Sequence, residues 1–577
     1  MGNQKRRQQN LVQGSLILAV ATLMVKVLGA IYKIPLANIL GGLGGGYYST
    51  AYDIYLPVYS LAMAGLPVAV SRMVAESAAK KNYNNTRKIL KIAQRAFLIT
   101  GTVGTVAILA LTYFYLFSDP FRSLFNITSG ADNVYSIMLI SFSILFCCIM
   151  SSYRGYYEGL RNMYPTAVSQ VIEAAGKLIV GLVLAGGVKY VCTSQLGMTA
   201  DEAAPFAAGG AVLGVTLGSA VGAIYLIIRH RRAGDGITEE EIAASAPADS
   251  TKRLLKMLIA IAIPIVIGSL VRDIASLVDL TTVKARLSTV VTANPNLIED
   301  CFGLSVKYDD IDKTVTYLYG CYKTFAYSIY NLVPTITAVI GVSTIPTLCT
   351  AWSSQDKDSV KESVHSILKL TSVISLPAGI GIIALAGPIL NLLFSDQPNE
   401  VAISTPILMV LGMSAIFAGI AVPTTSMLQA IGKQNIPVIN MAVGVLLKIV
   451  VNYTLVGIES INVVGAPAGT GVCYAYIMIA NLLCLRHYSK VKLGVVRTVI
   501  KPLVCALLCG ATAYFGYELL SGVGLSGKLG TAICIVLAGV VYALCLGVTK
   551  TFTKNDILML PKGEKLVKVL AKLRWIG

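Results

Sequence analysis

The stretch "LANILGGLGGGYYSTAYDIYLPVYSLAMAGLPVAVS", from Leu36 to Ser71, contains one charged residue, Asp53. A carboxylate that faces lipid costs several kilocalories per mole, so such a residue is expected to face a cavity or a partner of opposite charge. Three tyrosines and a proline surround it in "AYDIYLPVYS" (Ala51–Ser60). The stretch therefore predicts membrane-embedded helices in which the one charged residue, Asp53, faces a cavity or a charged partner and not lipid.

The composition of the whole chain supports this interpretation. The chain has 577 residues, of which 55% are hydrophobic and 13% are charged, and its mean hydropathy is +0.71. About a quarter of the residues of a soluble domain are charged. Runs of about 20 apolar residues, each enough to cross a bilayer as a helix, recur along the sequence, and the alternating segments of a membrane β-barrel do not. We predict an all-α polytopic membrane protein.

The apolar runs predict fourteen transmembrane helices. Most of the 47 Lys and Arg residues fall in segments that are cytoplasmic if both termini are cytoplasmic, as the positive-inside rule requires. This topology, together with attraction to anionic lipid, explains the net charge of +18, so we expect no nucleic-acid partner. The predicted spans are 11–40, 48–71, 92–116, 133–153, 165–188, 207–228, 257–283, 315–349, 370–395, 401–431, 437–457, 463–485, 502–521 and 529–549.

Two polar segments interrupt the apolar pattern. Residues 229–253 are rich in charged and small residues, which is typical of a cytoplasmic linker. After Lys562, apolar residues alternate with lysines at helical spacing, which indicates either a helix on the membrane surface or a solvated tail. We therefore expect pseudo-symmetric six-helix lobes at 1–228 and 257–488, a linker at 229–256, two additional helices within 489–552, and an amphipathic cytoplasmic tail at 553–577.

An internal repeat supports the two lobes. "AYDIYLP" at Ala51–Pro57 resembles "AYSIYNLVP" at Ala326–Pro334, and "ILK" at Ile89–Lys91 returns at Ile367–Lys369 at nearly the same offset. Both copies start from the cytoplasm, so the repeat is parallel. Transporters built this way bind their substrate between the lobes and alternate access by rocking.

Charged residues inside the spans predict a central binding cavity. Cations outnumber anions among them, which favours an anionic substrate such as a phosphate. Two structural alternatives remain open: Glu173 and Lys177, at i and i+4, could form an ion pair, and the tyrosines at 52, 55 and 59 could simply pack. The residues expected to line the cavity are Lys26, Lys33, Asp53, Tyr52, Tyr55, Glu173, Lys177, Arg272, Asp273, Asp279, Lys323, Lys448 and Asn452.

The sequence offers no sign of catalysis. It contains no phosphate-binding GxxxxGK[ST] loop, and its three histidines fall in predicted cytoplasmic segments. The twelve cysteines show no CxxC spacing, and only Cys192 and Cys301 fall in predicted external loops, where they could pair. We expect a secondary transporter that needs no cofactor or metal, not an enzyme.

Two longer motifs carry a family resemblance. "KVLGAIYKIPLANILGGLGGGYYSTAYDIYLPVYSLAMAGLPVAVSRMVAE" (Lys26–Glu76) and "YRGYYEGLRNMYPTAVSQVIE" (Tyr153–Glu173) resemble the polysaccharide-flippase branch of the multidrug/oligosaccharidyl-lipid/polysaccharide exporter superfamily. They are most similar to its SpoVB/YtgP group of Gram-positive bacteria, which is related to the MurJ-type lipid II flippases. The resemblance covers almost the whole chain.

The resemblance implies a flippase in the bacterial cell membrane for an undecaprenyl-diphosphate-linked cell-wall precursor. It implies a cationic cavity between two lobes, to which Lys26, Asp53 and Lys323 would contribute, and a lipid-tail groove at helices 13 and 14. Some relatives bind sodium near helices 7, 11 and 12. Here Lys448 and Asn452 stand in helix 11, and an ammonium would occupy the cation's place. We therefore expect no sodium site, and membrane potential as the driving force.

Several alternatives remain open. The substrate could be lipid II in growth or sporulation or another lipid-linked polysaccharide unit, and the protein could be a drug/ion antiporter of the MATE type or a non-transporting scaffold for wall synthesis. We expect a monomer, with cell-wall synthesis proteins as further candidate partners. We also expect Asp53 to face Lys26 or Lys33 when no substrate is bound.

Overall fold

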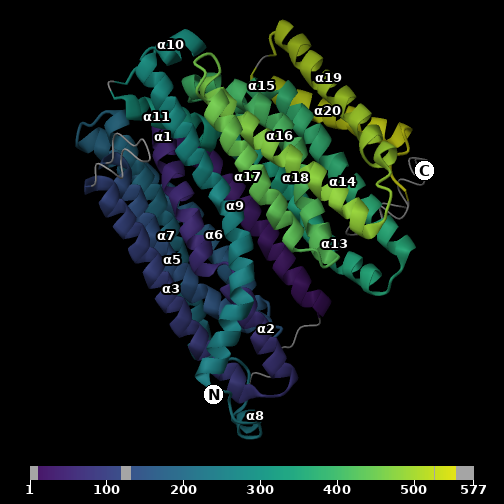
Figure 1. The fold of residues 1–577 in the computed structure, drawn as a ribbon. Coiled ribbons are helices and arrows are strands. Elements are labelled where there is room, and N and C mark those ends of the chain that lie inside the picture. Colours follow the sequence, from purple (N-terminus) through teal and green to yellow (C-terminus); the bar gives the residue numbers. More distant parts are fainter. Residues whose placement is uncertain (1–10, 118–130, 309, 526, 554–577) are drawn as a thin grey trace. The chain divides into compact units, whose positions relative to one another are not determined.

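The chain folds into two units of packed helices. The computed structural model describes residues 11–117, 131–308, 310–525 and 527–553 (Figure 1), and every regular element in these ranges is a helix. The all-α prediction is thereby confirmed. Unit 1 comprises Met1–Thr281 and unit 2 comprises Thr282–Gly577. The boundary lies inside helix α9 (Thr251–Ala293), and the lobe limits expected from the sequence stay a prediction. The predicted amphipathic tail lies outside the described residues.

Gly41 divides the first long helix of unit 1. Helix α1 runs from Leu11 to Met63, but at Gly41 φ is 64° and ψ is −169°. A residue without a Cβ atom adopts this conformation at little cost, whereas other residues are strained there. The two halves of α1 correspond to the first two predicted spans, and α2 (Leu66–Ala79) extends beyond the predicted end of the second.

Four further long helices pack in unit 1. Helix α5 packs against both α3 and α7 (Figure 1), and α6 packs most extensively against α7. Aromatic and branched side chains such as Phe97, Ile140 and Tyr156 fill the space between them and are fully buried. The bounds are α3 (Tyr83–Phe117), α5 (Ala131–Gly159), α6 (Tyr164–Tyr190) and α7 (Ala200–Ala233).

Glycines bring α6 and α7 into backbone contact. Gly210, Gly214, Gly218 and Gly222 recur every four residues of α7, so they share one face. A Cβ atom on Gly214 would overlap the backbone of Gly181 in α6, and one on Gly218 would lie 2.7 Å from the backbone nitrogen of residue 177. Small residues let membrane helices approach closely enough for dispersion contacts, because lipid supplies no hydrophobic driving force. The backbone around Lys177 is therefore fixed by its neighbour helix.

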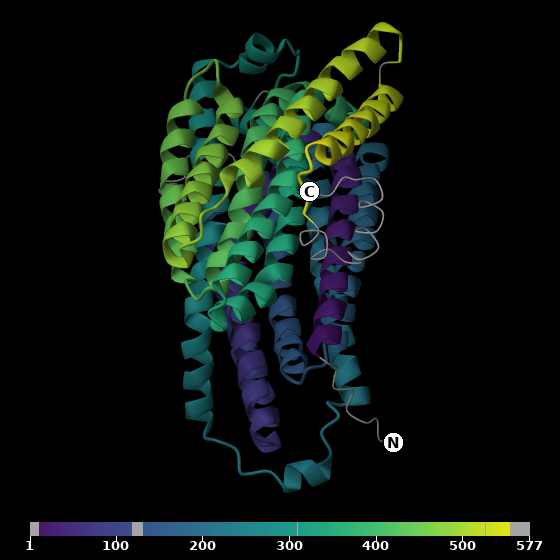
Figure 2. The same cartoon turned by 90° about the vertical axis from the view of Figure 1, so that its right-hand side faces the viewer.

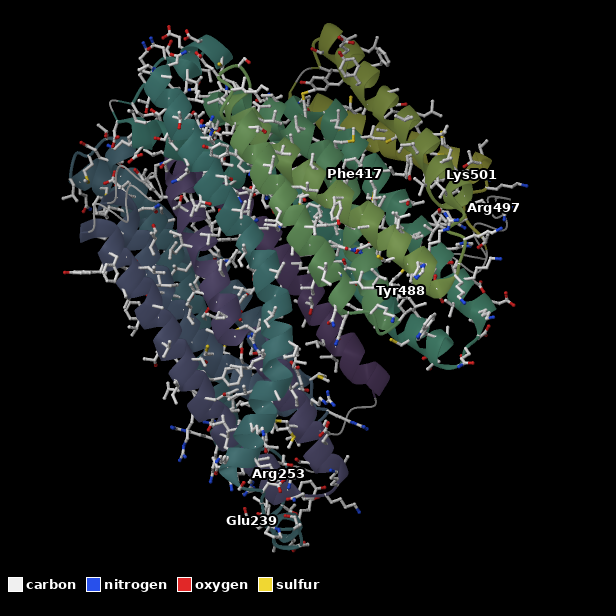
Figure 3. The ribbon with its side chains drawn as sticks, viewed as in Figure 1. Glu239, Arg253, Phe417, Tyr488, Arg497 and Lys501 are labelled. Carbon is white, nitrogen blue, oxygen red and sulfur yellow. The ribbon has the colours of Figure 1, made fainter. Side chains whose placement is uncertain are left out.

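The segment between α7 and α9 is ordered and bonded to α3. It contains the short helix α8 (Glu239–Ala243) and leads to α9 at one end of unit 1 (Figure 2); Glu239 and Arg253 mark it in Figure 3. Asn85 and Asp249 exchange two hydrogen bonds, of 2.8 and 2.7 Å, and Arg87 pairs with Asp235 at 3.4 Å. The polar composition predicts a linker, and these bonds make it part of unit 1.

Unit 2 begins with broken helices. The eighth predicted span is divided among α11 (Ile311–Gly320), a π-helical turn (Cys321–Ala326), α12 (Tyr327–Tyr330) and α13 (Leu332–Ser353). A π turn holds one residue more than an α turn and is frequent at functional sites. Ser404 donates a hydrogen bond of 3.0 Å to the carbonyl of Cys321 in this turn, which satisfies a backbone group in the membrane interior.

The remaining helices of unit 2 are mostly long and apolar. The buried side chains of Asn440 and Asn481, which lie on two of these helices, are joined by a hydrogen bond of 2.9 Å. The bounds are α10 (Leu297–Phe302), α14 (Lys357–Ala384), α15 (Ala386–Leu393), α16 (Pro398–Ala430), α17 (Asn435–Leu455), α18 (Ala466–Ser489), α19 (Lys501–Gly522) and α20 (Lys528–Val548).

The helix count agrees with the sequence in part. Twelve stretches of the described residues are long and apolar enough to cross a membrane. The first and second predicted spans fall in one of these stretches, and the broken eighth span is in none. Helices occupy all the predicted ranges, but fourteen crossings and the cytoplasmic placement of the termini stay predictions.

Replacement of Gly214 tests the contact between α6 and α7. We expect Gly214→Ala to lower the free energy of unfolding by about 1–3 kcal/mol, because the new methyl group overlaps the backbone of α6. Thermal unfolding in detergent measures the loss. Gly187→Ala, on α6 where a Cβ atom meets nothing within 4 Å, is the matched control. Equal stability of the two variants would contradict the close packing.

Candidate functional site

Lys177 of α6 is held by two tyrosines of α1. Its ammonium donates a hydrogen bond of 2.6 Å to the hydroxyl of Tyr52. The same nitrogen lies 4.9 Å from the ring centroid of Tyr52 and 5.5 Å from that of Tyr32. An ammonium this close to an aromatic face is attracted by the ring's quadrupole. Tyrosine thus stabilises the charge of Lys177 without cancelling it.

The tyrosines of α1 form a continuous row. Ring centroids lie 4.8 Å apart for Tyr48 and Tyr52, 6.0 Å for Tyr52 and Tyr55, and 5.2 Å for Tyr55 and Tyr59. Tyr55 is a core residue, and Tyr48, Tyr52 and Tyr59 pack against the same core. The packing interpretation of the stripe is therefore correct for its rings, while the hydroxyl of Tyr52 has the additional role of binding Lys177.

Glu173 pairs with an arginine that the sequence interpretation missed. The Glu173 carboxylate lies 2.9 Å from a terminal nitrogen of Arg154 in α5, and it accepts a hydrogen bond of 3.4 Å from Ser219 in α7. The ion pair between Glu173 and Lys177 that the i, i+4 spacing allows is not formed. The carboxylate binds Arg154 and not Lys177, because the N–H groups of a guanidinium on the neighbouring helix can align with its oxygens.

Two of the other expected acids of unit 1 are buried, and the third makes a polar contact. Asp53 and Asp279 are buried, with 6% and 1% of their surface exposed. Asp273 of α9 accepts a hydrogen bond from the buried hydroxyl of Ser60, so α1 and α9 meet at a polar contact. The burial of Asp53 agrees with a charge that avoids lipid.

The expected cations of α1 differ in exposure. Lys26 is half-buried, whereas Lys33 is exposed. A contact of either with Asp53 stays a prediction. The side chain of Arg272 lies outside the described residues.

Lys323 of unit 2 is enclosed by three tyrosines. It belongs to the π-helical turn and is buried. Its ammonium lies 5.8 Å, 5.5 Å and 4.9 Å from the ring centroids of Tyr319, Tyr322 and Tyr327. The hydroxyl of Tyr322 forms a hydrogen bond of 3.4 Å with the hydroxyl of Thr470 in α18. The turn thus presents a second lysine within an aromatic enclosure.

Lys448 and Asn452 lie on one face of α17 and are both buried. Asn452 donates a hydrogen bond of 3.3 Å to the hydroxyl of Thr282. Among the described residues, no group of three or more His, Cys, Asp or Glu is arranged to hold a metal ion.

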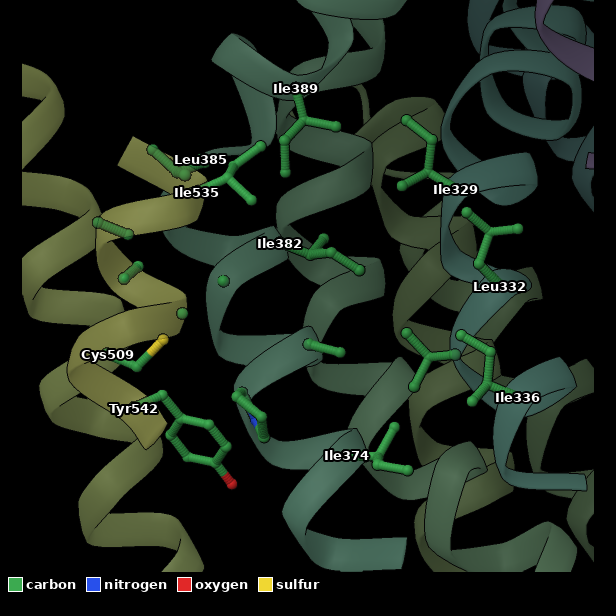
Figure 4. A pocket seen from close by; sticks show the side chains of 17 residues that line it. Ile329, Leu332, Ile336, Ile374, Ile382, Leu385, Ile389, Cys509, Ile535 and Tyr542 are labelled. Carbon is green, nitrogen blue, oxygen red and sulfur yellow. The ribbon is translucent and has the colours of Figure 1, made fainter. Parts of the chain in front are cut away.

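An apolar groove opens in unit 2 beside the last two helices. Its volume is about 420 Å³, and it lies between α13, α14, α19 and α20 (Figure 4). Tyr542 stands at its edge, where its hydroxyl donates a hydrogen bond of 2.8 Å to the carbonyl of Val373. A long hydrocarbon chain fits such a lining. Prominent lining residues are Leu332, Ile336, Ile374, Ile382, Ile389 and Ile535.

Cys192 and Cys301 are free thiols, so the disulfide considered from the sequence is not present. The Cys301 thiol instead donates to the carbonyl of Glu459 at 3.6 Å.

The sequence did not identify most of the tyrosines beside Lys177 and Lys323, or the arginine beside Glu173. Tyr32, Tyr319 and Tyr322 are too common in helices to stand out by type. The sequence could have identified Arg154 as a site residue, because it lies in the second family motif and directly follows Tyr153, which is buried.

Two family models match the chain. The model described as "Polysaccharide biosynthesis protein" matches residues 11–352, and the model described as "Lipid II flippase MurJ" matches residues 321–537.

Individual relatives match over nearly the full length. The chain is 24% identical to the lipid II flippase MurJ of Bacillus subtilis (strain 168), over 93% of this chain and 94% of that one. It is 21% identical to stage V sporulation protein B of the same organism, over 97% and 99%. Its fold is similar to a solved lipid II flippase MurJ in an inward closed conformation, with a TM-score of 0.62, 16% identity, and 92% and 98% of the chains covered.

Removal of one hydroxyl tests the bond to Lys177. We expect Tyr52→Phe to lower the free energy of unfolding by about 1.5–3 kcal/mol, because a hydrogen bond to a charged group is lost inside the membrane. Tyr59→Phe, in the same row, is the control, and thermal unfolding is the measurement. A Tyr52→Phe variant as stable as the control would show that the bond contributes nothing.

Proposed function

Because the chain belongs to the polysaccharide biosynthesis protein family, we propose that it is a flippase for an undecaprenyl-diphosphate-linked cell-wall saccharide precursor. The proposed substrate is lipid II, which moves from the inner to the outer leaflet of the bacterial cell membrane by alternating access. We propose that the chain acts as a monomer with both termini in the cytoplasm.

One observation carries the proposal: each unit encloses a lysine ammonium among tyrosines, Lys177 in unit 1 and Lys323 in unit 2. An ammonium in an interior of low dielectric binds phosphate strongly, because water does not screen the attraction. Tyrosine rings also suit the faces of sugars. A diphosphate attached to a saccharide presents a phosphate to the ammonium and a sugar ring to the tyrosines. It therefore fits such a lysine and its tyrosines better than a cationic drug does.

The groove of unit 2 supports the lipid part of the substrate. Its lining is apolar and contacts α19 and α20, the additional helices of the sequence analysis. A polyprenyl tail that lies there would stay in an apolar environment while its diphosphate binds a lysine ammonium. The proposed ligand is thus an amphiphile whose two ends need different sites.

Depletion of the protein in a strain without other flippases tests the function. We expect labelled lipid II to remain on the inner leaflet, and expression of the unmodified chain to restore its appearance outside. Normal export of lipid II without the protein would contradict the lipid II proposal. Export failure of a different lipid-linked unit would assign that substrate instead, and efflux of cationic dyes would favour a drug antiporter.

Lysine substitutions test the residues. We expect Lys177→Gln and Lys323→Gln each to reduce restoration of growth in that strain at normal protein level, because a phosphate contact is lost. The exposed Lys91 of α3 provides the control Lys91→Gln. Full restoration by both variants would favour a scaffold role, which does not require these charges.

Filling the groove tests the tail site. Gly539 lines the groove, and a Cβ atom there meets nothing within 4 Å, so Gly539→Leu occupies space without moving the backbone. We expect binding of undecaprenyl diphosphate in nanodiscs to weaken about tenfold, the effect of excluding about two CH₂ groups. Binding of the much shorter farnesyl diphosphate should change little. Gly522→Leu, at an equally open position on α19 outside the groove, is the control, and equal affinities for both variants would contradict the assignment.

A further inference from the structure

Glu173 and Lys177 have the spacing of a helical ion pair but belong to different contacts. Residues at i and i+4 face each other along a helix, and Glu followed by Lys is the favourable order. Yet the Glu173 carboxylate contacts Arg154 at 2.9 Å and Ser219 at 3.4 Å, one with each oxygen. The Lys177 ammonium instead contacts the hydroxyl of Tyr52 at 2.6 Å.

Arg154 is itself held in place for this contact. Its Nε atom donates a hydrogen bond of 2.9 Å to the hydroxyl of Ser169 in α6, and a terminal nitrogen lies 3.5 Å from the sulfur of Met150. Only 15% of the Arg154 side chain is exposed, against 28% of Glu173. Bonds from two helices thus fix the guanidinium beside the carboxylate.

The charges of this group determine what Lys177 can bind. Arg154, Glu173 and Lys177 together carry one net positive charge, and Tyr52 adds none. If the Glu173 carboxylate paired with Lys177, the charge of the ammonium would already be compensated. A phosphate could then bind Lys177 only by displacing the carboxylate. With Glu173 held by Arg154, the positive charge remains at Lys177.

We propose that Arg154 is a positioning residue that binds Glu173 and thereby leaves the charge of Lys177 for the diphosphate of the substrate. The inference rests on the proposed function for the identity of the anion. It gives Glu173 a different role from the substrate contact expected from the sequence: the carboxylate lies near two cations and lowers the energy of burying both.

Second-site rescue tests the proposal. The probe is farnesyl diphosphate, with the full chain in nanodiscs. We expect Arg154→Gln to weaken binding about tenfold, the size of one charge-assisted contact, because the released carboxylate turns to Lys177. In Arg154→Gln/Glu173→Gln the competing carboxylate is gone, and we expect affinity within about twofold of the unmodified protein. Arg95→Gln, at an exposed site on α3, is the control.

A double variant that binds as weakly as Arg154→Gln would overturn the proposal, since Arg154 would then act as a ligand or a purely structural residue. If the unmodified protein binds the probe no better than Lys177→Gln does, the proposed function fails instead.

A second measurement needs no ligand. In a cycle of Glu173→Gln and Lys177→Gln, the non-additive part of the two shifts in melting temperature measures the coupling between the residues. We expect this coupling to be small when Arg154 is present and to grow by about 2 °C in the Arg154→Gln background, because the two residues then pair directly. The same coupling in both backgrounds would contradict the proposed competition.

Discussion

An ammonium in the membrane interior needs a partner, and the kind of partner decides whether its charge can still be used. Lipid offers neither water nor hydrogen bonds, so a lysine there must be compensated by protein. A carboxylate would compensate it completely. Tyrosine compensates it partly, through the ring face and the hydroxyl, and adds no charge. Lys177 and Lys323 both have tyrosine rings as neighbours, and the hydrogen-bond partner of the Lys177 ammonium is a neutral hydroxyl, so Lys177 can be buried and still attract an anion.

The internal repeat shows how the two units reach this arrangement differently. Tyr52 and Tyr327 follow the alanine of the repeated motif, and each ring centroid lies 4.9 Å from a lysine nitrogen. In unit 1 the lysine comes from α6, whereas in unit 2 it comes from the π turn four residues before the tyrosine. The position after Tyr52 is Asp53, and the matching position after Tyr327 is Ser328. The tyrosine is thus shared by the two copies, while the charges around it are not.

Hydropathy and motifs predicted most of the fold because they reflect local constraints. Apolar runs mark the helices, and the family motifs mark the region of Tyr52 and Asp53. The details that the sequence did not predict depend on contacts between distant segments or on backbone geometry. Glu173 and Lys177 look like a pair until α5 brings Arg154 to the carboxylate. The composition of the predicted linker at 229–256 does not reveal that its Asp249 binds Asn85 of α3. The apolar runs predicted a break between residues 40 and 48, but not that Gly41, with a φ of 64°, is the residue that makes it.

The polar site and the apolar groove need different degrees of rigidity. Recognition of a phosphate depends on distance and direction, so a displaced ammonium loses its hydrogen bond. Lys177 lies where glycines bring the backbones of α6 and α7 into contact, the arrangement that leaves a helix least room to shift. A hydrocarbon tail requires only that water be excluded and that space be available, because dispersion contacts have no preferred direction. The groove beside α19 and α20 provides that space without any aligned polar group in its lining except Tyr542, which is turned to the backbone of α14.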